Sequence, residues 1–390
     1  MPANETFARI KAHFLRIRAL PPDERSIATA ALEDAAVRAE VISLLDNDCE
    51  DTGFLRARPQ TVTAPPPDAH GPPPLVGAVL LERFEVLAMV GEGGFGWVFW
   101  GHDRARDEPV AVKVSKPITD ATVVEDVLAA FEREGVALAA LARRSPHIVE
   151  YRDVGAWRDA GGRRHPFIVM EWLAGPTLAA LSRDRPAGER WTLDEAMSLL
   201  QEVADGLTVV HAHGVAHRDL KPSNVLCVPG PDGAVLKLVD FGAAKIAAER
   251  ARGFESTGRQ VGMLTFDYAA PELLSRVYGA TGPWTDVFAL AMMLTELMLG
   301  RHPWGGLDTL TTMARITDLA ARPTPGALGV QVEPPVEAVM ARALAVEASA
   351  RYPDACTFWQ ALTAARRGEP TDLTPRGPLA RMLAGLRRRT

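Results

Sequence analysis

The sequence has few cysteines and little net charge. Cys49, Cys227 and Cys356 are the three cysteines among 390 residues, and none forms a CxxC pair or has a histidine at metal-ligand spacing. This pattern excludes a cysteine-based metal site and predicts free thiols in a reducing cytoplasm. A net charge of −6 and a pI near 5.9 argue against a nucleic-acid or acidic partner.

Long apolar segments are also missing. The N-terminus "MPANETFARIKAHFLRIRAL" has charges throughout and no apolar core, so it is not a secretory signal. The longest apolar stretch, "VFALAMMLTELMLG" (287–300), is too short to cross a bilayer and contains Glu296. It predicts a buried helix in a protein without a transmembrane span.

Composition and periodicity divide the chain into four parts. Residues 1–56 have the apolar spacing of short helices, and residues 57–78 contain seven prolines, which favour a semi-rigid linker. Residues 79–366 begin with short β-like runs, "RFEVLAMV", "GWVFWG" and "EPVAVKV", and become mostly helical after 192. A basic tail, 367–390, follows. The expected fold class is α+β, with a β-rich lobe (79–170), a larger helical lobe (174–366) and a helical leader before them.

The first motif is "VGEGGFGWVFWG" (90–101), in which Gly91, Gly93 and Gly96 are spaced GxGxxG. Glycines allow the backbone to fold tightly over phosphates and to present N–H groups to them. In a dinucleotide fold a helix would follow, whereas strand-like runs follow here, which favours a β-hairpin flap. Lys113 lies within the next apolar strand, "VAVK", and needs a partner, for which Glu132 and Glu134 are both candidates.

Two further motifs carry the chemistry of phosphoryl transfer. "HRDLKPSN" (217–224) contains Asp219, which can accept a proton, and Lys221, which can stabilise a moving phosphoryl group. Asn224 and Asp240, the latter in "LVDFGAAK" (238–245), offer hard oxygen ligands for a divalent metal. Each motif alone is consistent with a polar turn, but chance rarely supplies all of them in this order.

With these motifs the chain resembles the bacterial eukaryotic-like (Hanks-type) serine/threonine protein kinases over about residues 80–365. The resemblance implies that ATP and Mg²⁺, or Mn²⁺ in its place, are used to phosphorylate protein substrates in bacterial signalling. It implies that Asp219 is the catalytic base, that Lys113 binds phosphates and pairs with Glu134, and that Asn224 and Asp240 hold the metal. It further implies nucleotide contacts along the flap, strand and hinge: Val90, Gly91, Glu92, Gly93, Gly94, Gly96, Val98, Ala111, Lys113, Met170, Glu171, Trp172 and Leu173.

The C-terminal half adds further similarities to this family and one position that differs from it. "YAAPELL" (268–274) is similar to the family's APE motif, which implies a buried salt bridge between Glu272 and Arg351. Asp286 would cap the backbone of the catalytic loop. Leu264 stands where kinases of this type usually have a glycine, so we expect unusual peptide docking.

Regulation is expected between Asp240 and Glu272. A phosphate on Ser256 or Thr257 could pair with Arg218, and Thr265 is a further regulatory position. The leader has a docking or regulatory role that the residues do not specify. The basic tail suits a solvated or partner-docking segment, with weak membrane-surface contact as the alternative, and a transient homodimer would allow autophosphorylation in trans.

Two other readings of the motifs stay open. A pseudokinase scaffold would lack Lys113, Asp219 or Asp240, and all three are present. A small-molecule kinase would not need the APE segment. We therefore expect a cytoplasmic protein kinase.

Overall fold

The computed structural model describes residues 9, 12, 13, 16, 17, 20–34, 37, 38, 41, 72–93, 96–115, 121–186, 189–230, 233–241, 267–307, 309–320 and 322–369. The chain forms two compact units. The first comprises Met1–Ala187 and His217–Leu264, and the second comprises Gly188–Ala216 and Thr265–Thr390.

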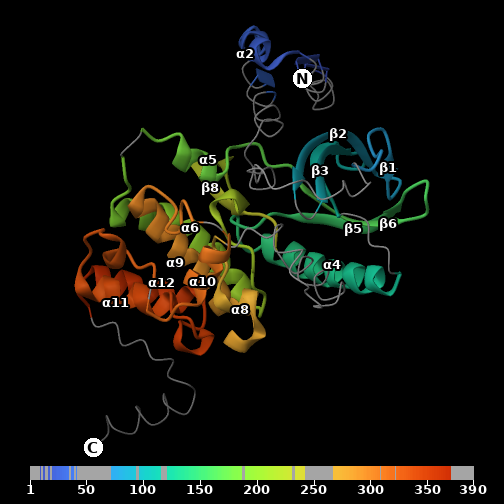
Figure 1. Ribbon diagram of the computed structural model, residues 1–390. Helices are drawn as coiled ribbons and strands as arrows, with labels where there is room; N and C mark the ends of the chain where they lie inside the picture. Colours follow the sequence, from blue (N-terminus) through green and yellow to red (C-terminus); the bar gives the residue numbers. More distant parts are fainter. Residues whose placement is uncertain are drawn as a thin grey trace, which may run out of the picture. The chain divides into compact units, whose positions relative to one another are not determined.

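A six-stranded sheet forms the centre of the first unit (Figure 1). Its strand order is β1-β2-β3-β4-β6-β5, and every neighbouring pair is antiparallel. Aromatic and β-branched residues suit such a sheet, and one side of it buries Phe84, Trp97, Phe99 and Phe167. The strands are β1 (Val79–Leu80), β2 (Phe84–Gly93), β3 (Gly96–Asp103), β4 (Glu108–Ser115), β5 (Tyr151–Arg158) and β6 (Arg164–Glu171).

The predicted strands are confirmed, and the chain between β4 and β5 forms a helix. Helix α4 (Ala121–Ala142) packs against β5 and β6, and its buried Leu138 and Leu141 lie one turn apart. Leu75, which we assigned to the proline-rich linker, is fully buried in the core of the sheet. The helical leader includes α2 (Pro22–Ala30), which begins at Pro22 because proline suits the first turn of a helix.

The rest of the first unit carries the two charged motifs, which are "HRDLKPSN" (217–224) and "LVDFGAAK" (238–245). A short helix α5 (Leu178–Arg183) starts at Thr177, whose hydroxyl accepts a hydrogen bond from the Ala180 N–H. The 3₁₀ turn η1 (Pro222–Asn224) leads into the hairpin of β7 (Val225–Gly230) and β8 (Gly233–Leu238).

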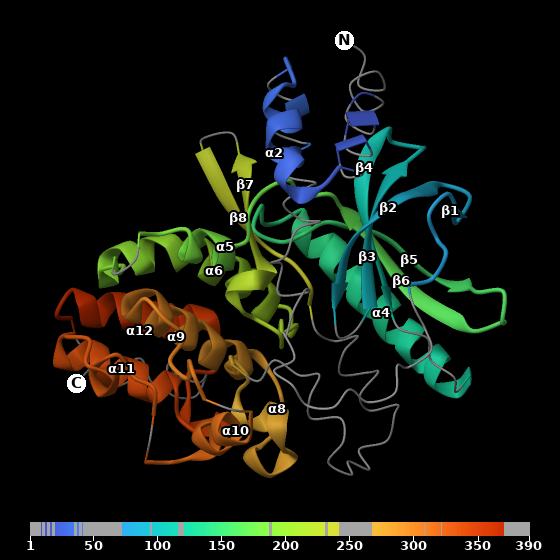
Figure 2. The ribbon, with the colours of Figure 1, turned by 45° about the horizontal axis from the view of Figure 1, so that its top comes forward.

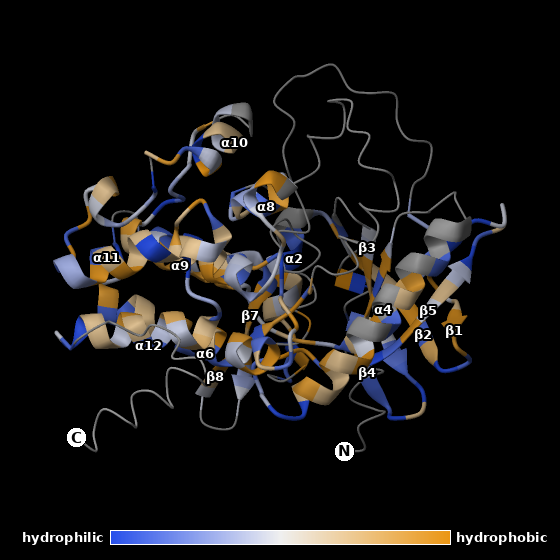
Figure 3. Ribbon diagram, turned by 90° about the horizontal axis from the view of Figure 1, so that it is seen from below, coloured by the Kyte–Doolittle hydropathy of each residue, from blue (hydrophilic) through white to orange (hydrophobic). Residues whose placement is uncertain are grey.

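The second unit is helical among its described residues. Helix α9 is the predicted buried helix, and its central residues from Thr285 to Thr295 are all buried. In Figure 3 the outer helices α11 and α12 each combine hydrophobic and hydrophilic residues. Within the described part of the chain, no helix has the length and apolar character needed to cross a membrane. The helices are α6 (Leu193–His211), α8 (Pro271–Leu274), α9 (Pro283–Leu299), α10 (Thr309–Thr317), α11 (Pro334–Ala343) and α12 (Ala355–Arg366), with 3₁₀ turns at Arg276–Tyr278, Gly326–Leu328 and Ala348–Ala350.

A buried ion pair joins α8 to the segment before α12. Arg351 donates two hydrogen bonds of 2.8 Å to the two carboxylate oxygens of Glu272, and both side chains are 0% exposed. Glu272 also accepts a bond from the Thr285 hydroxyl, and Arg351 donates to the carbonyls of Ala345 and Val346. The charges are therefore bidentate and surrounded by hydrogen bonds, the condition under which a buried pair is tolerated.

Asp286 follows Thr285 on α9 and is also buried. The His211 ring accepts a hydrogen bond from the Ala355 N–H at Nδ1, so its proton is on Nε2, which donates to Asp286 at 2.8 Å. The predicted role of Asp286 at the catalytic loop stays a prediction.

Glu296 on α9 belongs to a partly buried polar cluster. Its carboxyl accepts a hydrogen bond from the Tyr268 hydroxyl, and the Tyr268 ring contacts the His302 ring edge to face. Burial, with a smaller contribution from the charge of Asp267, raises the pKa of Glu296 from 4.5 to about 7. Burial also raises the pKa of Tyr268 and lowers that of His302.

The pKa of Glu296 predicts a specific dependence of stability on pH. The unfolded chain releases this proton near pH 4.5 and the folded chain near pH 7, so the folded state binds more protons between these values. Its stabilising contribution is complete below pH 4.5 and is lost as the pH rises to 7, by about 3 kcal/mol. We expect Glu296→Gln to abolish this loss, measured as the difference between variant and wild type in denaturant unfolding from pH 4.5 to 8. The pKa of His302 is lowered, so its contribution to stability rises with pH in the variant and in the wild type alike. The difference in unfolding free energy between the two proteins therefore isolates Glu296. Parallel plots of this free energy against pH would contradict the assignment.

Candidate active site

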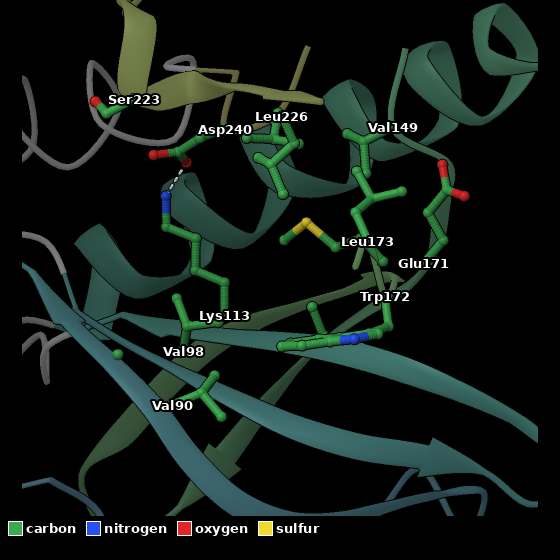
Figure 4. Close-up of a pocket in the computed structure, with 14 residues that line it drawn as sticks. Val90, Val98, Lys113, Val149, Glu171, Trp172, Leu173, Ser223, Leu226 and Asp240 are labelled. Carbon is green, nitrogen blue, oxygen red and sulfur yellow. Dashed lines mark hydrogen bonds and ion pairs between the residues drawn. The ribbon is translucent and has the colours of Figure 1, made fainter. Parts of the chain in front are cut away.

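A pocket in the first unit collects residues from the sheet, the chain after β6 and the two charged motifs (Figure 4). Its wall is mostly apolar, and Lys113 and Asp240 are charged groups within it, as is typical of small-molecule sites. Nine of the predicted nucleotide contacts line this pocket: Val90, Gly91, Val98, Ala111, Lys113, Met170, Glu171, Trp172 and Leu173.

Strand β4 positions Lys113 in the middle of the sheet, between Val98 on β3 and Ile168 on β6. The Lys113 ammonium forms an ion pair with the carboxylate of Asp240, 127 residues further along the chain (Figure 4). We expected Glu134, with Glu132 as the alternative, as the partner. The side chain of Glu134 lies outside the described residues, and the alternative Glu132 is exposed.

Two hydrogen bonds tie the loop 217–224 to Val239, directly after β8, and a third closes the loop on itself. The buried His217 ring lies 2.9 Å from the Val239 carbonyl through Nε2 and stacks on Phe241 at 4.4 Å. The Val239 N–H donates to the Asn224 carbonyl, and the Asn224 N–H to that of Lys221. Arg218 and Asp240 both have φ of +64°, a conformation that costs non-glycine residues energy and is concentrated at functional sites.

The loop brings Asp219, Lys221 and Asn224 together. The Asp219 carboxylate is 3.3 Å from the Lys221 ammonium and accepts a 3.2 Å hydrogen bond from the Asn224 amide. The same amide donates to the Asp219 carbonyl at 2.7 Å. Asn224 is fully buried, so these bonds fix both the rotamer of the amide and the position of the carboxylate.

The surroundings of the Asn224 amide oxygen show whether a divalent metal fits this site. Oδ1 is buried and has no hydrogen-bond partner among the described residues, whereas buried polar atoms are usually satisfied. With Asp240 it supplies two hard oxygen donors, and Mg²⁺ typically takes one or two protein oxygens together with phosphate and water. The donor set therefore fits such an ion.

The last residue of β6 is tied to the β7–β8 hairpin and to the residue before β5. Glu171 Oε1 accepts hydrogen bonds from the Glu150 N–H at 2.9 Å and from the Lys237 ammonium at 2.6 Å. The neighbouring Trp172 extends its indole toward the side of the pocket lined by Val90 and Val98 (Figure 4).

Some predicted residues lie elsewhere. Glu92 is exposed, and neither it nor Gly93 and Gly96 line the pocket. A methyl group on Gly96 would lie 1.9 Å from the Val114 carbonyl oxygen, so close strand approach alone requires a glycine there. Gly94, Ser256, Thr257, Leu264, Thr265 and residues 370–390 of the basic tail lie outside the described residues.

Four pocket residues were missed by the sequence analysis: Val149, Ser223, Leu226 and Val239. Ser223 and Val239 are adjacent to predicted metal ligands, so proximity along the chain was an available signal. Val149 and Leu226 carry no such signal, because an apolar residue in a strand-like run is equally suited to a core.

Comparison with known proteins agrees with this geometry. The family profile described as "Protein kinase domain" matches residues 84–352, and the chain therefore belongs to the protein kinase family. The predicted fold class, a β-rich N-lobe and a helical C-lobe, is confirmed. The PknI kinase domain of Mycobacterium tuberculosis has the same fold, with a TM-score of 0.54 and 24% identity over 75% of this chain and 99% of that one.

Bacterial serine/threonine kinases are among the similar sequences. PknL of Mycobacterium tuberculosis is 34% identical over 284 residues, which is 72% of this chain and 65% of PknL. The serine/threonine-protein kinase drp72 of Corynebacterium efficiens is 32% identical over 72% of this chain and 50% of its own length. The chain thus spans about half to two thirds of these relatives. The similarities agree with the predicted enzyme class.

Proposed function

We propose that this protein transfers the γ-phosphate of ATP to serine and threonine hydroxyls of proteins, itself included. The observation that carries the proposal is the pocket in which Lys113 and Asp240 form an ion pair, next to a loop that holds Asp219, Lys221 and Asn224 together. Acceptors on proteins, and the serine/threonine preference, are supported by the bacterial relatives.

Each residue has a defined task in this proposal. Asp219 accepts the proton of the attacking hydroxyl, and Lys221, 3.3 Å from it, balances the charge of the group being transferred. Lys113 holds the phosphates, and the apolar residues Val98, Ala111 and Leu226 enclose the adenine. A Mg²⁺ ion held by Asn224 and Asp240 would neutralise charge between the β- and γ-phosphates. Mn²⁺ would satisfy the same oxygen donors.

The other expected features belong to the same proposal. We place the protein in the cytoplasm, with protein substrates and a transient homodimer for phosphorylation in trans. Ser256, Thr257 and Thr265 are the proposed regulatory sites, with Arg218 as the partner of a phosphate on the first two.

Replacing Lys113 tests the proposal. We expect wild-type protein with Mg²⁺ and γ-labelled ATP to incorporate label on serine and threonine, identified by mass spectrometry. Lys113→Met should reduce incorporation about 10²-fold or more, because a preorganised cation in a partly dry site is lost. Arg104→Met, which removes an exposed cation from the turn between β3 and β4, should leave incorporation unchanged. Nucleotide binding without transfer to the protein or to generic substrates would instead support a binding scaffold.

A further inference from the structure

The helical leader shares a hydrophobic core with the pocket strands. Four described leader residues, Ile17, Leu32, Val37 and Val41, are between 0% and 6% exposed. They form one cluster with Leu87, Ala88 and Val90 of β2 and Trp100 of β3. Ala28 of helix α2, drawn in blue in Figure 2, packs against the same cluster. The described leader residues are therefore packed against strands β2 and β3.

The same cluster reaches the wall of the pocket. Val90 is a member of it, and Val98 and Trp172 pack against it. All three residues also line the pocket (Figure 4). A single layer of side chains thus belongs to both the leader contact and the pocket, so a shift of the leader changes the shape of the pocket directly.

Polar contacts hold the leader in the shape that presents these apolar residues. The Asp34 carboxylate accepts a hydrogen bond from the Val37 N–H at 3.2 Å, as an N-cap does, and forms an ion pair with Arg9 at 3.1 Å. Arg38 donates to the Leu32 carbonyl at 2.9 Å. These contacts hold the chain around Asp34, with Leu32 before it and Val37 after it.

Strands β2 and β3 meet at a glycine-rich end next to Val90 and Val98. Strands β2 and β3 are joined through Gly93 and Gly96, and glycine adds backbone freedom that must be lost when a ligand binds. A site held in its binding conformation before the ligand arrives binds more tightly, because less ordering remains to be done. We propose that the helical leader is a positioning element that holds Val90, Val98 and Trp172 in place and so raises the affinity for ATP. This inference rests on the proposed nucleotide binding.

The test replaces one buried leader residue in the full chain. Val41→Asp places a carboxylate in the cluster and should detach the leader, seen as faster amide exchange over residues 9–41. We expect the Kd for a fluorescent ATP analogue and the KM for ATP to rise about tenfold, while kcat at saturating ATP changes less than twofold. Ile27→Asp makes the same change at a leader residue that is 74% exposed and should alter none of these quantities.

Unchanged affinity for the ATP analogue after the leader detaches overturns the proposal. A leader whose amides stay protected from exchange in Val41→Asp also overturns it, because the apolar cluster would then not be what holds the leader in place. If Val41→Asp does not fold, Val37→Ala combined with Val41→Ala should raise the Kd about threefold, and an unchanged Kd overturns the proposal. Wild-type protein that binds no nucleotide would overturn the proposed function itself, and this inference with it.

Discussion

Asp219→Asn is expected to lower the rate of phosphate transfer by about 10²- to 10⁴-fold, the usual contribution of a general base. Asparagine has nearly the same shape but cannot accept the proton of the attacking hydroxyl. Asp219 does not line the nucleotide pocket, so affinity for the ATP analogue should change little. Single-turnover transfer of labelled phosphate, measured beside nucleotide binding, separates the two effects.

Two comparisons sharpen this prediction. Asp205→Asn makes the same change at an exposed position of α6 and should retain full activity. The Asn224 amide donates a 2.7 Å hydrogen bond to the backbone carbonyl of residue 219, and this bond should remain in Asp219→Asn. The thermal stability of the variant should therefore be close to that of wild type. A variant that binds nucleotide and retains full transfer would remove Asp219 from the proposed role.

Arg351→Met is expected to destabilise the protein by about 3–5 kcal/mol, because it leaves the Glu272 carboxylate buried without its cation. Both side chains are 0% exposed, so water cannot replace the lost hydrogen bonds. Denaturant unfolding of the full chain measures the loss. The double variant Glu272→Gln with Arg351→Met should recover part of it, since the buried charge is then removed.

A surface pair of the same geometry serves as the control. Arg366 makes two hydrogen bonds of 2.7 and 2.8 Å to Asp194, but this pair lies at the surface. Arg366→Met should leave stability close to that of wild type, because exposed pairs exchange their partner for water. Equal losses at the two sites would show that burial is not what makes the Glu272–Arg351 pair important.

Much of the fold was predictable because its determinants are local. Strands β2, β3 and β4 follow from alternating β-branched and aromatic residues, and helix α4 from its helical apolar spacing. Helix α9 was identified as buried from its uninterrupted apolar run. The short strands β7 and β8 were not predicted. Each has only six residues, which is too short for the periodicity to distinguish a strand from a loop.

The chemistry of the candidate site was predictable for a related reason. Asp219, Lys221 and Asn224 lie within six residues, so their contact needs only one loop. The sequence alone therefore determined the family, the pocket strands and the residues proposed for phosphate transfer. Their types and spacing are properties of short segments.

Only the tertiary structure decided which distant segments meet. It paired Lys113 with Asp240 across 127 residues, added Val149 and Leu226 to the pocket, and joined the leader to Leu87, Val90 and Trp100. An apolar residue such as Val41 specifies that it is buried but not by what, because hydrophobic burial has no direction. Those partners were chosen by the packing of the whole unit.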